Sequence, residues 1–89
     1  MLSFFQVSGR SMMPSFKPRQ YVLSVKSKNI KKNDVIVFRD NLDKKFIKRV
    51  SWIDRGKFQV ESDNSDYPSM ITSKILKTKN IIGKVVFKF

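Results

Sequence analysis

The stretch KFIKRVSWI, residues 45–53, is rich in β-branched and aromatic residues. Such a composition favours an extended strand. The residues DRGK at 54–57 follow it, and KFQVES at 57–62 is a second strand-like run. A tight, glycine-containing turn between two such runs is typical of a β-hairpin. We therefore expect residues 45–62 to form an antiparallel hairpin.

Three further strand-like runs lie outside this hairpin, namely QYVLSVK at 20–26, DVIVF at 34–38 and IIGKVVFKF at 81–89. Polar segments separate the runs, and residues 62–69 are dense in Asp, Asn, Ser and Pro, which indicates an ordered loop. The runs and their turns together predict an all-β fold, in which the strands form a compact, strongly bent sheet or barrel.

Helical periodicity is absent from every long segment, so we expect no more than a single helical turn after Ser11 or around residues 71–76. A chain of 89 residues has room for one small core. We therefore expect residues 1–89 to form a single domain.

The chain contains no Cys and no His. This composition excludes disulfides, zinc-thiolate sites, a cysteine nucleophile and a Ser-His-Asp triad. A hydrolase built from this sequence must take its general base from Lys, Asp, Glu or Tyr. We expect no metal site and no cofactor.

The formal net charge is +12, from 19 basic and 7 acidic residues. Such an excess suits a polyanion, a membrane surface or an acidic protein, although a solvated basic surface is the simpler explanation. The lysines are spread along the sequence rather than clustered, which argues against a nucleic-acid partner. No run approaches the ~20 apolar residues of a membrane span, and the first residues are too short for a signal peptide. We therefore expect a cytoplasmic protein without a membrane anchor.

The segment VSGRSMMPSF, residues 7–16, is a candidate for nucleophilic chemistry. Gly9 permits unusual backbone angles, and Pro14 stiffens the chain just beyond Ser11. A serine in such a bend presents its hydroxyl and aims backbone N–H groups at one point, as an oxyanion hole requires. The alternative is a plain turn with an exposed serine.

The second candidate is Lys48, which lies between Phe46 and Val50 on one face of the expected strand. Burial disfavours the charged form of an amine and lowers its pKa, so a buried lysine can accept a proton from a serine hydroxyl. The alternative is a lysine whose ammonium reaches solvent at the sheet edge. Lys84 has the same alternating context, and periodicity alone does not choose between the two lysines.

Taken together, the two segments resemble the serine-lysine peptidases, a group that includes bacterial signal peptidase I and the self-cleaving domain of LexA-type repressors. The resemblance covers almost the whole chain, in the expected order. The sequence segments that match the family pattern are SMMPSF at 11–16, PRQYVL at 18–23, KNDVIVF at 32–38, FIKRV at 46–50, VESDNSDYP at 60–68 and IGKV at 82–85. It implies the bent sheet of the LexA and signal-peptidase catalytic core.

The resemblance also implies roles for individual residues. Ser11 would attack the scissile carbonyl, and Lys48 would accept its proton. Backbone N–H groups of Ser11 and its neighbour would hold the oxyanion, two loop residues would brace the site, and a further hydroxyl would orient the lysine. The residues implied in these supporting roles are Gly9, Arg10, Asp63, Asn64 and Ser69.

Departures from the family pattern affect turns rather than the dyad. Arg19-Gln20 replaces the usual Gly-Asp, Asn33 replaces a glycine, and Gly9 stands where signal peptidases often have a serine. No anchor, DNA-binding domain or self-cleavage segment precedes the first matching segment, so we expect a stand-alone catalytic core. Such a core most resembles the maturation proteases of nickel-type superoxide dismutase.

This narrower resemblance implies that a precursor protein, the nickel superoxide dismutase precursor, is bound as an extended peptide and cut after a small residue. Three alternatives stay open. The first is a signal-peptidase-like protein with another substrate, and the second is a basic all-β module that binds nucleic acid. The third is a family member that binds without cleaving.

Overall fold

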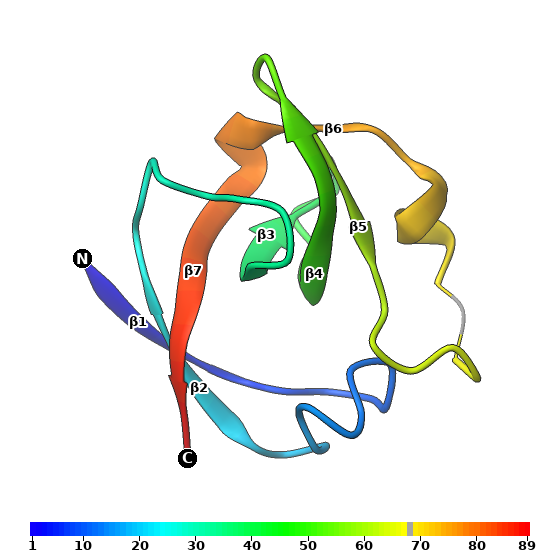
Figure 1. Cartoon of the computed structure of the whole chain (residues 1–89). Helices are drawn as coiled ribbons and strands as arrows, with labels where there is room; N and C mark the ends of the chain where they lie inside the picture. The colour runs from blue at the N-terminus through cyan, green and yellow to red at the C-terminus, as the bar shows by residue number, and fades with distance from the viewer. Residues whose placement is uncertain (68) are drawn as a thin grey trace.

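The computed structural model describes residues 1–67 and 69–89, and its secondary structure is seven strands and two short 3₁₀ helices. All strand pairs are antiparallel, in the order β1-β2-β7-β3-β4-β5-β6, and the sheet curls into a half-barrel (Figure 1). The expected all-β fold is confirmed. The elements are β1 Leu2–Gln6, β2 Tyr21–Val25, β3 Val35–Arg39, β4 Lys45–Asp54, β5 Lys57–Glu61, η1 Met70–Ser73, β6 Leu76–Lys77, η2 Thr78–Asn80 and β7 Ile81–Lys88.

The hairpin expected over residues 45–62 is present as β4 and β5. Its turn places Arg55 at φ 50° and Gly56 at φ 78°, the left-handed pair that suits the twist of a tight hairpin. The register shifts between Val50 and Trp52, as in a β-bulge. Strict alternation would put Trp52 on the buried face with Val50, but the bulge leaves its side chain 43% exposed.

Two elements were not expected from the sequence. β1 carries two adjacent phenylalanines and no regular alternation, and its pairing with β2 along its whole length makes it a strand. β6 has only two residues, which is too short for any periodicity, and it forms by pairing with β5.

The buried side chains form two clusters. The first lies along β3, β4 and β5 and includes Ile36, Phe38, Val50 and Phe58. The second lies under β1 and β2 and consists of Val7, Met12, Phe16, Val22 and Val35. Because three members of the second cluster come from residues 7–16, the core itself holds the segment that carries Ser11.

In the described part of the chain, no helix is long and apolar enough to cross a membrane.

Candidate active site

The segment after β1 is held in a fixed bend by its own buried side chains. Val7 and Met12 are only 4% and 1% exposed, so they anchor the chain on both sides of Ser11. Between them Gly9 adopts φ +79°, a left-handed conformation that costs little for glycine and strains other residues. Open space surrounds the position where a Cβ would lie, so the backbone angle alone requires glycine. The bend leaves Ser11 facing the hairpin.

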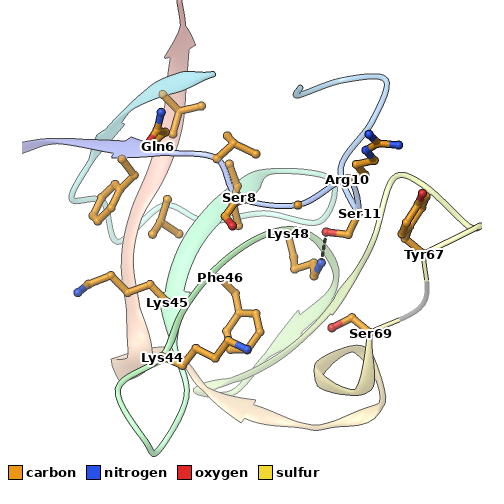
Figure 2. A pocket seen from close by; sticks show the side chains of 16 residues that line it. Gln6, Ser8, Arg10, Ser11, Lys44, Lys45, Phe46, Lys48, Tyr67 and Ser69 are labelled. Carbon is orange, nitrogen blue, oxygen red and sulfur yellow. Dashed lines mark hydrogen bonds between the residues drawn. The ribbon is translucent and has the colours of Figure 1, made fainter. Parts of the chain in front are cut away.

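Lys48 reaches Ser11 from the opposite side. It lies on β4 with only 4% of its surface exposed, and its Nζ donates a hydrogen bond to Ser11 Oγ at 2.5 Å (Figure 2). The other lysine with the same alternating context, Lys84, lies on β7 and forms an ion pair with Asp34 at 3.4 Å. The fold therefore brings Ser11 together with Lys48 and not with Lys84.

The environment of Lys48 lowers the pKa of its amine. Burial lowers the pKa of its side chain, because removing the ammonium from water disfavours the charged form. The nearby carboxylate of Asp63 acts in the opposite direction and raises the pKa, but its effect is smaller. Lys48 thus loses its proton at a lower pH than an ordinary lysine.

Asp63 is fixed by Arg49, the residue next to Lys48. The guanidinium donates two hydrogen bonds to the carboxylate, from Nε to Oδ1 and from Nη2 to Oδ2, each at 2.8 Å. Arg49 also donates to the carbonyl of Asn33 at 2.8 Å. These hydrogen bonds from Arg49 hold the pKa of the Asp63 carboxyl below its ordinary value. The bidentate pair joins β4 to the loop after β5.

Asn64 connects that loop to the Ser11 segment. Its backbone N–H donates to the carbonyl of Ser11 at 2.8 Å, and its side-chain amide donates to the carbonyl of Arg10 at 3.1 Å. Asp63 N–H also contacts the sulfur of Met12 at 3.4 Å. The two loop residues named from the sequence, Asp63 and Asn64, therefore both touch the elements that carry the Ser11–Lys48 pair.

A groove of about 390 Å³ opens beside the pair. One wall is the chain from Phe5 to Ser11, and the other is Lys44 with the first residues of β4, up to Lys48. Within residues 1–67 and 69–89, the N–H groups of residues 8–12, which include Arg10 and Ser11, donate to no backbone group. The site thus combines a hydroxyl, a buried amine and free backbone donors beside an open groove.

Ser69 and Tyr67 line the groove on the side away from β1 (Figure 2). No hydrogen bond joins Ser69 to Lys48 among the described residues; the carbonyl of Ser69 accepts from Thr72 instead. Another hydroxyl near the end of β5 belongs to Ser62, which follows Glu61, the residue that pairs with Arg49 in the sheet. The Ser62 hydroxyl is buried and has no hydrogen-bond partner in the described part of the chain.

Two features of this site were missed in the sequence. The Arg49–Asp63 pair was missed because alternation places Arg49 on the face away from Lys48, while its partner lies in an irregular loop. The buried hydroxyl of Ser62 was missed because only the folded structure determines burial and hydrogen-bond partners. The described residues contain no group of three or more His, Cys, Asp or Glu that could hold a metal ion.

A family model for Peptidase S24-like domains matches residues 2–86, nearly the whole chain. The chain belongs to the Peptidase S24-like family. No curated protein matches it. This is the LexA-like family that the matching sequence segments indicated. The resemblance to LexA-like peptidases is therefore confirmed. Membership associates the fold with a peptidase or LexA-like function.

The Arg49–Asp63 pair supplies a stability prediction. We expect Asp63→Asn to lower the free energy of unfolding by about 1–3 kcal/mol, between the values for exposed and fully buried pairs. The two side chains are 29% and 12% exposed. The folded-state pKa of Asp63 is lowered, so this stability is complete above the pKa of an unfolded Asp and is lost as pH falls through the folded value.

Urea unfolding of both proteins between about pH 7 and about pH 3 measures this effect, and the gap between them should narrow toward acid. The matched control is Asp43→Asn, which removes the ion pair between Arg39 and Asp43, whose side chains are 52% and 71% exposed. This variant should change the free energy of unfolding by less than about 0.5 kcal/mol. Equal losses in the two variants would contradict the structural role given to Asp63.

Proposed function

We propose that this protein is a serine endopeptidase in which Ser11 is the nucleophile and Lys48 is the general base. The observation that carries the proposal is the hydrogen bond between Lys48 Nζ and Ser11 Oγ, made by a lysine that is only 4% exposed. A serine hydroxyl is a weak nucleophile unless an adjacent base removes its proton. With no His in the chain, a desolvated lysine is the base within reach.

The reaction follows from these two side chains. Ser11 Oγ attacks the scissile carbonyl while its proton passes to the neutral amine of Lys48. The resulting ammonium returns that proton to the departing amine, and the C–N bond breaks to leave an ester on Ser11. A water molecule then attacks the ester as Lys48 again accepts a proton, and Ser11 leaves as its hydroxyl.

The backbone N–H groups of Arg10 and Ser11 are the proposed oxyanion donors. Both are free of other backbone partners among the described residues, and the left-handed angle at Gly9 directs the chain into the bend that carries them. Preorganised donors of this kind stabilise the charge that develops on the carbonyl oxygen in the transition state. Asn64 holds the backbone that carries these donors, because it donates hydrogen bonds to the carbonyls of Arg10 and Ser11.

The groove beside Ser11 suits an extended peptide. β1 is an edge strand: among residues 1–67 and 69–89 its strand partner is β2, and its other edge is unpaired. The last residues of β1 continue as a wall of the groove. A peptide that adds to such an edge gains backbone hydrogen bonds, while pockets on alternate sides select its side chains. The substrate is thus proposed to be a segment of unfolded chain, such as the leader of a precursor protein.

The narrower proposal is that the substrate is the precursor of nickel superoxide dismutase. It rests on the resemblance of the sequence to the maturation proteases of that enzyme. A chemical reason accompanies it, because the nickel site in that enzyme uses the free N-terminus and the leader must be removed at a single bond. The protease itself needs no metal for this reaction.

The test mixes the purified protein with that precursor and determines the new N-terminus by mass spectrometry. We expect one cut that leaves the metal-binding His first, and no cut with the Ser11→Ala variant. Cleavage of membrane-protein leaders with the precursor left intact would reassign the chain to a signal-peptidase role. A protein that binds these peptides without cutting any of them would be a non-catalytic member of the family.

A further inference from the structure

The net charge of +12 is unevenly distributed over the fold. Residues 34–66 contain seven basic and seven acidic side chains, so this segment is neutral. Residues 1–33 contain seven Lys and Arg, residues 67–89 contain five Lys, and neither segment has any Asp or Glu. These two segments supply β1, β2 and β7, which are neighbours in the sheet and lie together near both termini (Figure 1). Three lysines of residues 67–89, Lys74, Lys77 and Lys79, lie instead on the stretch from η1 to η2, whose strand β6 is at the opposite edge of the sheet. The side built by β1, β2 and β7 therefore carries part of the charge excess and has no acidic residue on its strands.

The same three strands carry a row of apolar side chains on their outer face. Phe4 on β1 is opposite Leu23 on β2, and Leu23 is opposite Phe87 on β7. Residues opposite one another on antiparallel strands point to the same face. Their sequence neighbours Phe5 and Val22 point inward to the core, so the row faces outward. Phe4 and Phe87 are accordingly 65% and 58% exposed.

Further apolar side chains extend this row into a patch. The ring centroid of Phe89 lies 5.7 Å from that of Phe4 and 5.0 Å from that of Phe87. Phe89 is itself 61% exposed. Contiguous exposed apolar surface of this kind marks a site of contact with a partner or a membrane. We call it the aromatic face, and it consists of Leu2, Phe4, Tyr21, Leu23, Phe87 and Phe89.

Basic residues flank the aromatic face at both ends of the β1–β2 pair. Lys26 and Lys28 follow β2 at the end where the Lys26 N–H donates to the carbonyl of Met1 at 3.1 Å. Arg19 precedes β2 at the other end, where its carbonyl accepts from the Gln6 side chain at 3.3 Å. All three cationic residues are exposed. The patch thus combines an apolar centre with positive charge on either side.

We propose that the aromatic face docks on an anionic lipid membrane. Its rings enter the headgroup region, and the flanking lysines contact acidic headgroups, as in proteins that combine apolar insertion with basic residues. A second copy of the chain is a poorer partner, because it would bring together two segments of the same charge. A nucleic acid is also poorer, because Leu2 and Leu23 have no flat ring on which a base can stack.

Docking in this way leaves the catalytic groove open. The groove is lined by Phe5 and Val22, which lie on the other face of the β1–β2 pair from Phe4 and Leu23. The proposal does not depend on cleavage, since lipid binding can be measured with an inactive protein.

The experiment measures flotation of the purified full chain with lipid vesicles. We expect binding to phosphatidylcholine vesicles that contain phosphatidylserine, at least about ten-fold weaker binding to phosphatidylcholine alone, and weakening as salt rises. Phe4→Ser combined with Phe87→Ser should weaken binding by about ten-fold or more. The matched control is Leu42→Ser, which changes an apolar residue that is 89% exposed in the β3–β4 turn and should not affect binding.

Charge is tested separately. Lys26→Gln combined with Lys28→Gln should weaken binding to the anionic vesicles by about 25-fold, since each lysine near such a surface contributes about five-fold. Lys57→Gln, on β5 in the neutral segment, is the control and should leave binding unchanged. These residues are exposed, and circular dichroism verifies that each variant folds.

Three results would overturn the proposal. The first is failure of the wild-type chain to bind anionic vesicles, or equal binding to both vesicle types. The second is a concentration-dependent dimer that Phe4→Ser with Phe87→Ser abolishes, which would assign the aromatic face to a second copy. The third is binding to single-stranded DNA without binding to vesicles, which would assign the charge to nucleic acid.

Discussion

Replacing Ser11 by Ala is expected to lower the rate of precursor cleavage by about 10⁴-fold or more, which is the scale of loss when a serine protease loses its nucleophile. The variant keeps the buried anchors Val7 and Met12 and the hydrogen bonds that Asn64 makes to the backbone of residues 10 and 11. It should therefore fold normally and still bind the precursor. Quantitative mass spectrometry of the new N-terminus measures the loss, and urea unfolding verifies the fold.

The matched control is Ser65→Ala, which changes an exposed serine in the loop that contains Asn64. This variant also removes a serine hydroxyl, but one that makes no hydrogen bond to Lys48. It should therefore cleave at the wild-type rate. Retention of full activity by Ser11→Ala would refute the nucleophile. Equal losses in both variants would instead indicate that the loop, and not the hydroxyl, governs the rate.

Much of the fold follows from local sequence, and the exceptions have physical causes. The β4–β5 hairpin was predictable because two runs rich in β-branched and aromatic residues flank the Arg55-Gly56 turn. The exposure of Trp52 was not, because a bulge reverses the face and depends on how two strands pair. β1 also escaped prediction, since its strand conformation comes from its pairing with β2.

The candidate site divides in the same way. Ser11 and Lys48 could be named because the segments around them, in their order along the chain, resemble those of the serine-lysine peptidases; alternation alone did not choose between Lys48 and Lys84. The bidentate Arg49–Asp63 pair could not, because it joins a strand to an irregular loop and only the folded register aligns them.

The charge pattern is a further case. The lysines are spread along the sequence, yet the fold makes neighbours of β1, β2 and β7, three strands from segments 1–33 and 67–89, which have no acidic residues. An even distribution along a chain therefore does not imply an even distribution over the surface.

Replacing Lys48 by Met should separate catalysis from stability. We expect cleavage to fall by about 10²–10⁴-fold, the usual contribution of a general base. Stability should rise by about 0.5–2 kcal/mol near neutral pH, because a buried amine is exchanged for an apolar side chain of similar length. The pKa of Lys48 is lowered on folding, so the unfolded chain binds more protons, and wild-type stability increases with pH until the unfolded lysine also deprotonates. The advantage of the variant should therefore shrink as pH rises.

The same pKa determines how activity depends on pH. Wild-type cleavage should rise as Lys48 loses its proton, with a midpoint below the ordinary lysine value of about 10.4, because burial lowers the pKa. Asp63→Asn should move this midpoint lower still, since the carboxylate of Asp63 raises the pKa of Lys48. The control is Lys84→Met, which removes the lysine paired with Asp34 and should leave the midpoint unchanged. A midpoint that does not respond to Asp63→Asn, or a Lys48→Met variant that cleaves at the wild-type rate, would show that Lys48 is not the base.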